Sequence, residues 1–146
     1  EIDRKIKMTI KEIQNEIVDE FSMFDDWMQR YEYIIELGKS LPLIDEQYKV
    51  DENIIKGCQS KVWVHGEEQD GKIVFTADSD AILTKGIIAI LIRAFSNQTP
   101  AAILDANTDF IDEIGLKEHL SPTRANGLVS MIKQIKMYAL AFESRR

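Results

Sequence analysis

The residue with the most evident chemistry is Cys58, the only cysteine among the 146 residues, in the stretch GCQSKVWV (57–64). A single cysteine forms no disulfide within the chain and supplies no cluster of thiolate ligands. It is either a nucleophilic thiol or a small buried hydrophobic residue, as many free cysteines are. Gly57 permits a tight or positive-φ backbone before it, and Gln59 and Ser60 are polar. These neighbours favour a reactive thiol at a loop tip, held by the apolar strand that follows.

A reactive thiol needs a neighbouring positive charge or a helix N-terminus to favour the thiolate. Lys56 and Lys61 flank Cys58 and offer weak help of this kind. A cysteine–histidine hydrolase is disfavoured, because it needs a paired base, an orienting group and an oxyanion hole. His65 is expected on the wetter face of a strand, and His119 in a loop that it stabilises locally. No metal site is expected, since such sites need three or four suitable ligands.

Other candidate residues lie beyond the cysteine loop. Asp78, Ser79 and Asp80 are a carboxylate pair around a serine, which is also typical of a helix N-terminus. Arg124 falls in the first turn of the last predicted helix, where a cation opposes the helix dipole. This position suggests that Arg124 pairs with an acid or binds a partner. Gly127 in the same helix costs about 1 kcal/mol relative to alanine, and close packing of another backbone would explain it.

The composition is that of an ordinary globular chain, with 45% hydrophobic and 29% charged residues. A net charge of −7 argues against a nucleic-acid partner and against an anionic membrane surface, which both attract basic proteins. The most apolar run, GIIAILIRAF (86–95), is too short to span a bilayer and reads as a buried core helix. The start, EIDRKIKMTI, lacks the apolar core of a secretory signal. Together with the single cysteine, these features predict a reducing compartment, the cytoplasm.

Hydrophobic periodicity predicts two helices in the first part of the chain. The apolar face of the first helix carries Ile6, Ile10, Ile13, Ile17 and Phe21. The second helix is expected to start near Asp25, a good cap residue, and to stop at Gly38. After an irregular stretch, Ile54-Ile55 is a candidate for a short strand.

Two strands and several helices are predicted after the cysteine. The strands, 61–65 and 72–77, alternate apolar and polar residues and are joined by a polar loop ending in Asp70-Gly71. Ser79 or Asp80 then caps a long helix that runs to about Phe95. The later helices are expected to start at Thr99-Pro100, at Asp109 with an end at Gly115, and at Ser121-Pro122. The predicted fold is α+β, a small antiparallel sheet packed against several helices, in a single domain covering residues 1–146.

Several stretches, roughly within residues 24–138, occur in a specific order and spacing. They are the run from Trp27 through IIELGKSLP (34–42), GCQSKVW (57–63), DGKIVFTADSDAILTKGIIAIL (70–91), TPAAIL (99–104) and GLKEHLSPTRANGLVSMI (115–132). Together these motifs resemble the SufE family of sulfur-acceptor proteins, which includes the CsdE proteins. The resemblance implies the SufE/NifU-like form of the α+β fold.

The resemblance also implies a function. SufE-like proteins accept sulfur from a SufS-type cysteine desulfurase, stimulate that enzyme, and deliver the sulfur for iron–sulfur cluster assembly on a scaffold such as SufBCD. By this resemblance Cys58 is the acceptor, and the chain is a transfer partner rather than an enzyme. Pyridoxal phosphate belongs to the desulfurase, so no cofactor is expected here, and a homodimer is left open. Weaker roles, in shaping the site or contacting the partner, fall to Gly57, Gln59, Ser60, Asp78, Asp80, Lys85, His119 and Arg124.

The residues themselves agree with a sulfur carrier. Transfer needs one thiolate that attacks a sulfur atom, and a second cysteine would displace the outer sulfur as a disulfide forms. We expect Cys58 to rest in a pocket under apolar side chains and to swing out when the desulfurase docks. The alternatives are an interaction module with an inert Cys58 and a cluster-assembly scaffold of the NifU type. The single cysteine disfavours the scaffold, which needs several thiolate ligands.

Overall fold

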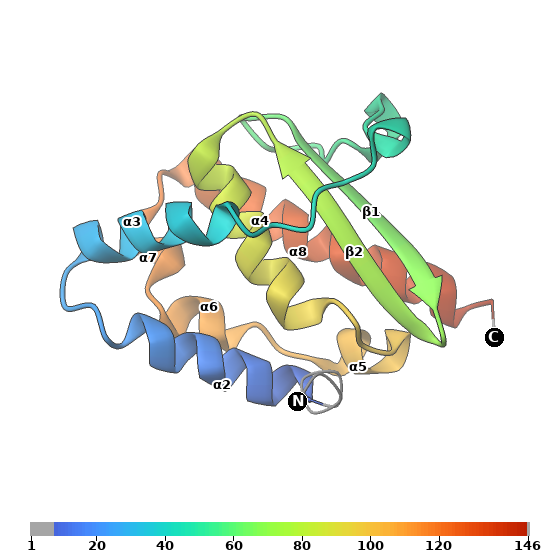
Figure 1. The fold of residues 1–146 in the computed structure, drawn as a ribbon, viewed down its shortest axis with the longest axis horizontal. Helices are drawn as coiled ribbons and strands as arrows, with labels where there is room; N and C mark the ends of the chain where they lie inside the picture. Colours follow the sequence, from blue (N-terminus) through green and yellow to red (C-terminus); the bar gives the residue numbers. More distant parts are fainter. Residues whose placement is uncertain (1–7, 146) are drawn as a thin grey trace.

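The computed structural model of the chain describes residues 8–145 and has the predicted α+β architecture (Figure 1). The elements in chain order are α2 (Ile10–Phe21), α3 (Trp27–Gly38), two short 3-10 helices (Glu46–Tyr48 and Asp51–Asn53), β1 (Val62–Gln69), β2 (Lys72–Ser79), α4 (Ile82–Phe95), α5 (Pro100–Asp105), α6 (Asp109–Glu113), α7 (Leu116–His119) and α8 (Pro122–Glu143). The two strands form one antiparallel hairpin. α4 crosses the centre of the molecule, and α8 runs diagonally across it.

The hairpin is longer than the sequence predicts. β1 runs to Gln69 rather than to His65, because Asp70 and Gly71 alone make the turn, with φ of 54° and 79°. A two-residue turn with both φ values positive matches the twist of the flanking strands. The polar residues 67–69, predicted as loop, therefore pair in the ladder with exposed side chains.

α4 is the predicted core helix and is buried on nearly all sides. α3 crosses it so closely at Gly86 that a Cβ there would lie 2.1 Å from the carbonyl oxygen of Ile34. The one charge in the apolar run, Arg93, reaches α2 and pairs with Glu16 and Glu20, each at 2.6 Å. α4 thus holds α2 and α3 on one side while the hairpin packs on another.

Side-chain caps mark most of the helix starts. Thr9 begins α2 with a capping box. α3 is capped by Asp26 rather than by the neighbouring Asp25, because the Asp26 carboxylate accepts the amide hydrogen three residues on. The two predicted cap-plus-proline starts, at Thr99 and Ser121, are confirmed for α5 and α8.

The remaining differences are small. Ile54 makes an isolated antiparallel bridge with Trp63 in place of the predicted short strand. The chain passes through Gly115 with φ of 77° and then forms α7, a helix that the sequence analysis did not separate. Ile6, predicted on the face of the first helix, lies outside the described residues. Between residues 8 and 145, no helix is both long and apolar enough to cross a membrane.

Candidate functional site

Cys58 lies in the loop that leads into β1, as predicted, and its side chain is half-buried. Gly57 before it has φ of 91°, the positive value that glycine adopts without strain. A Cβ at Gly57 would also lie 2.9 Å from Oγ of Ser130 on α8. The thiol turns inward rather than outward: Sγ donates a hydrogen bond to the carbonyl oxygen of Gly127, also on α8, over 3.6 Å.

A small cavity of about 10 Å³ adjoins the thiol. Its walls come from the loop, from the first turns of α4, and from the start of α8; they are Cys58, Gln59, Ser60, Thr84, Ile87, Thr123, Arg124, Gly127 and Met131. The space is about the size of one water molecule. The lining mixes apolar and polar side chains, in contrast to the apolar pocket that the sequence predicts.

Burial raises the pKa of the Cys58 thiol above its usual value. Lys56 and Lys61, the flanking lysines, make no contribution that offsets this effect. The resting thiol is therefore protonated at neutral pH, the form that is a poor nucleophile. Reaction requires the thiol to leave its place against α8 or to gain a charged partner.

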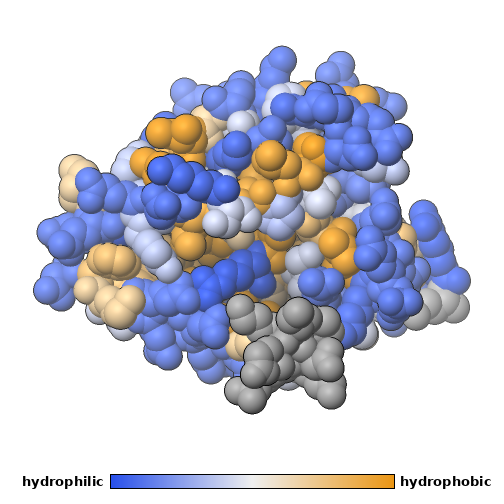
Figure 2. Space-filling model, in the orientation of Figure 1, coloured by the Kyte–Doolittle hydropathy of each residue, from blue (hydrophilic) through white to orange (hydrophobic). Residues whose placement is uncertain are grey.

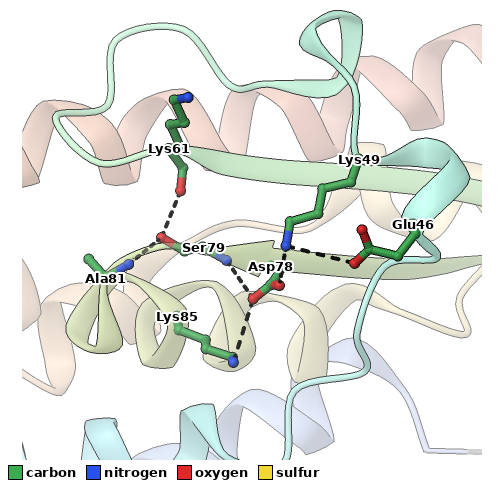
Figure 3. Close-up of polar contacts among 7 residues, drawn as sticks. All are labelled: Glu46, Lys49, Lys61, Asp78, Ser79, Ala81 and Lys85. Atoms are coloured by element: carbon green, nitrogen blue, oxygen red, sulfur yellow. Dashed lines mark hydrogen bonds and ion pairs between the residues drawn. The ribbon is translucent and has the colours of Figure 1, made fainter.

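The end of the loop is fastened to the chain just before α4 (Figure 3). The amide of Lys61 donates to Oδ1 of Asp80 at 3.1 Å, and the amide of Asp80 donates to the Lys61 carbonyl at 3.2 Å. Oγ of Ser79 donates to the same carbonyl at 2.8 Å. Asp80 and Ser79 were predicted to cap α4, but its cap residue is Ala81, which makes no side-chain cap. The two polar side chains instead fix where the cysteine loop ends and β1 begins.

Asp78 lies at the end of β2 among lysines (Figure 3). Its carboxylate is 3.0 Å from Nζ of Lys49 and 3.5 Å from Nζ of Lys85. Burial alone would raise the pKa of Asp78, but the hydrogen bonds from Lys49 and the Ser79 amide, with the charges of both lysines, lower it overall. Lys49 also lies over the ring of Trp63 in β1. Lys49, Asp78 and Lys85 thus join the segment before the cysteine loop to β1, β2 and α4.

Arg124 and His119 take different positions relative to Cys58. Arg124 lines the cavity from the first turn of α8, and among residues 8–145 its guanidinium makes no ion pair with a carboxylate. His119 does not line the cavity; it stacks on Trp27 with ring centres 4.2 Å apart, and its Nδ1 lies 2.8 Å from the Gly115 carbonyl. The histidine therefore joins α7 to α3.

His65 is likewise outside the cavity. Its ring stacks on Tyr48, with centres 3.7 Å apart, and Nε2 lies 3.3 Å from Oε1 of Glu67. Neither histidine is placed to serve as a base for Cys58. In the part of the chain that the structure describes, no three His, Cys, Asp or Glu side chains gather as a metal site.

Two contacts of the site were not foreseen as parts of it. Gly127 was singled out for its cost in a helix, and the element that packs on it is the cysteine loop itself. Lys49 was not singled out, because nothing in the segment 44–55 predicts that it folds back over β1 and meets Asp78.

A larger hollow of about 400 Å³ lies on another part of the surface, between α2, α3, α4 and β2. Figure 2 shows apolar side chains gathered in this region of the face that it draws. Ile13, Leu37 and Val74 are among its walls, and it shares no residue with the Cys58 cavity.

Comparison with known proteins places the chain in a family. Residues 15–139 match the SufE family, described as an Fe-S metabolism associated domain. A SufE-like protein of Rhizobium meliloti is 43% identical over 131 residues, which cover 86% of this chain and 93% of that protein. A SufE-like protein of Synechocystis is 38% identical over 127 residues, covering 87% of this chain and 80% of that protein.

Two further comparisons extend this picture. A chloroplastic/mitochondrial SufE-like protein of Arabidopsis thaliana is 39% identical over 129 residues, which are 88% of this chain but 35% of that longer protein. The solution structure of a hypothetical protein from Thermus thermophilus superposes with a TM-score of 0.74 at 19% identity, covering 88% of this chain and 94% of that one. This likeness concerns the fold alone. The chain belongs to the SufE family, and its membership supports a role in iron–sulfur metabolism.

Proposed function

We propose that the protein is a sulfur acceptor and carrier, which takes persulfide sulfur on Cys58 from a SufS-type cysteine desulfurase. The observation that carries the proposal is the placement of the single thiol in this SufE-family chain. Cys58 follows a glycine with positive φ, at a loop whose far end is fastened by Asp80. A thiol so placed can be hidden against α8 or presented to a partner by movement of a short segment.

The proposed transfer exchanges one sulfur–sulfur bond for another. Cys58 loses its proton to solvent, and the thiolate attacks the outer sulfur of a cysteine persulfide on the desulfurase. The bond between that outer sulfur and the desulfurase cysteine breaks, and the desulfurase cysteine leaves as a thiolate. A new sulfur–sulfur bond now joins the outer sulfur to Cys58. No external oxidant or reductant is consumed, and the desulfurase is free for another turnover.

The resting geometry supports a shielded thiol. Sγ donates a hydrogen bond to the Gly127 carbonyl and adjoins a small cavity, and burial raises the pKa of the thiol. In this position the thiol reacts slowly, and docking of the desulfurase must bring it out. The bonds that Asp80 and Ser79 make to Lys61 limit this movement to the residues before β1.

The surface around the loop supplies contacts for a protein partner. Arg124 carries a positive charge beside the cavity that no carboxylate of the described residues 8–145 pairs with. Ile82, at the start of α4 and near Asp80, is an exposed apolar side chain. We assign Arg124 to contact with the desulfurase, and Asp78, Lys85 and His119 to holding the surrounding elements in place.

The chain acts in this proposal as a partner of an enzyme. Pyridoxal phosphate and the cleavage of cysteine to alanine belong to the desulfurase. The carried sulfur then passes to a scaffold such as SufBCD in the cytoplasm, where iron–sulfur clusters are assembled.

Stimulation of a desulfurase tests the proposal. Wild-type protein added to a SufS-type desulfurase with excess cysteine is expected to raise the rate of alanine formation, because Cys58 removes the persulfide that blocks the next turnover. Cys58→Ser is expected to leave the rate at that of the desulfurase alone. Circular dichroism verifies that the variant is folded. Equal stimulation by both proteins would refute the acceptor role and would favour an interaction module with an inert thiol.

A further inference from the structure

We propose that Gly127 is a positioning residue for Cys58: the missing side chain at this point of α8 decides how deeply the thiol lies and leaves the space in which it is protected. This role concerns the resting thiol and deepens the proposed function. The first experiment below needs no partner, whereas the persulfide experiment rests on the proposed function. Gly127 has no reacting group, so it acts only through the place that it gives to Sγ.

The contact between position 127 and Cys58 is tight at one atom of the cysteine only. A Cβ built on Gly127 would lie 3.2 Å from Sγ of Cys58, but 3.6 Å from its Cα and 3.7 Å from its Cβ. The last two distances are ordinary van der Waals contacts, whereas the first is tighter than most real contacts of a Cβ, so Sγ would have to shift by a few tenths of an ångström. A methyl group at position 127 therefore has one atom in its way. That atom sits at the end of a rotatable bond and can turn aside without movement of the backbone.

The helix itself gives no reason for a glycine here. Gly127 lies inside α8, where alanine is favoured over glycine by about 1 kcal/mol. Among the described residues, the cysteine loop packs against Gly127. Sγ of Cys58 donates a hydrogen bond to the Gly127 carbonyl, and Gly57 meets Ser130 about one turn further along α8. The face of α8 that carries Gly127 and Ser130 thus receives the backbone of the cysteine loop.

The adjoining cavity leaves little room for the displaced sulfur. Its volume is about 10 Å³, the space of one water molecule, and Ile87 and Met131 form part of its walls. A methyl group at position 127 would occupy part of this space and turn Sγ toward solvent. The outer sulfur of a persulfide on Cys58 would likewise become more exposed to solvent, since it lies further from the backbone than Sγ.

Alkylation of the thiol tests the position of Sγ without any partner. The rate with iodoacetamide is measured from neutral to alkaline pH for the wild type, Gly127→Ala and the matched control Val129→Ala, an exposed residue of the same helix. Gly127→Ala is expected to react up to about tenfold faster at neutral pH, with its pH profile shifted toward lower pH, because one pKa unit changes the thiolate fraction about tenfold. Val129→Ala is expected to match the wild type.

Thermal unfolding separates positioning from a structural role. Gly127→Ala is expected to be folded, with a melting temperature equal to or above that of the wild type, because alanine is the better helix residue. Unchanged alkylation would overturn the inference, whatever the melting temperature. Loss of folding in Gly127→Ala but not in Val129→Ala would also overturn it, since more than one atom would then stand in the way.

The second arm follows the persulfide. After loading by a desulfurase, the outer sulfur on Gly127→Ala is expected to be lost to dithiothreitol faster than on the wild type. Equal loss would overturn the claim that Gly127 provides the protected space. If the wild type takes up no sulfur while the alkylation results hold, the proposed function fails and the positioning of the thiol by Gly127 stands.

Discussion

The resting state of the Cys58 thiol suits the proposed carrier, which must protect its thiol between transfers. At rest it is held against Gly127, with its pKa raised by burial, which slows reaction with small molecules. Since folding raises this pKa, the thiol contributes to stability below the pKa of the unfolded chain, and the contribution is lost as pH rises through the folded value. The proposed transfer at neutral pH therefore requires that the thiol leave its resting place.

Asp80 is the residue that should limit how far the loop opens. In Asp80→Ala the amide of Lys61 loses its acceptor at 3.1 Å, and the amide is left to solvent. Because the bond is exposed, we expect a loss of no more than about 1 kcal/mol in the free energy of unfolding by urea. Alkylation of Cys58 is expected to become faster, since the loop end is freer to move.

Asp105→Ala is the matched control for this substitution, because Asp105 is exposed at the end of α5 and lines no part of the Cys58 cavity. It should leave alkylation of Cys58 at the wild-type rate. An Asp80→Ala protein with a wild-type alkylation rate would contradict the role of Asp80 as the fastening of the loop.

At the scale of single residues, the sequence predicts which side chains can do chemistry better than it predicts which residues they contact. Cys58 can be singled out because it is the one thiol and follows a glycine in a polar stretch. The cap role predicted for Asp80 was wrong, because an acid before a helix has the same local signature whether it caps that helix or bonds a neighbouring loop. The partner of Gly127 depends on where α8 meets the loop, 69 residues away along the chain.

At the scale of the elements, the carboxylate of Glu20 joins α2 to both of its neighbouring helices, α3 and α4. Glu20 on α2 receives Arg93 from α4 and the hydroxyl of Tyr33 from α3. Hydrogen bonding from Arg93 lowers the pKa of Glu20 in spite of burial. Burial, followed by the bond to Glu20, raises the pKa of Tyr33 to about 12.

Glu20→Gln tests this junction. The variant is expected to lose about 1–2 kcal/mol in the free energy of unfolding, because among residues 8–145 the partly buried Arg93 keeps only the carboxylate of Glu16 as an ion-pair partner. Since folding lowers the pKa of Glu20, the wild-type advantage exists above the unfolded pKa and shrinks as pH falls. Urea unfolding at neutral and acidic pH measures both effects.

The same variant should change the titration of Tyr33. Absorbance at alkaline pH follows ionisation of the tyrosine, and in Glu20→Gln its pKa is expected to fall from about 12 toward the ordinary value, because the neighbouring negative charge is gone. Unchanged stability together with an unchanged titration would contradict the account of this junction.

Element types are predictable where local chemistry decides them. Thr99-Pro100 and Ser121-Pro122 place helix starts correctly, since both capping and the fixed φ of proline act locally. The strands were predicted too short, because the polar residues 67–69 look like loop until their pairing partners are known. α7 was missed because a single turn after Gly115 carries little periodicity.

On the scale of the whole molecule, the buried helix α4 connects the Cys58 cavity with the helices packed on its other side. Thr84 and Ile87 form one wall of the Cys58 cavity, while Gly86 between them meets α3. The loop end is fastened just before the same helix by Asp80. The cysteine loop therefore rests between two long helices, α4 and α8, and in the proposed transfer only the short segment before β1 moves.

Intact mass measures directly whether Cys58 accepts sulfur. The protein is mixed with a SufS-type desulfurase and cysteine, beside Cys58→Ser. We expect the wild type to gain one sulfur atom that a reductant removes, and the variant to gain none. A wild type that gains no sulfur, while the desulfurase itself carries a persulfide, would contradict the account, and so would an equal gain on Cys58→Ser.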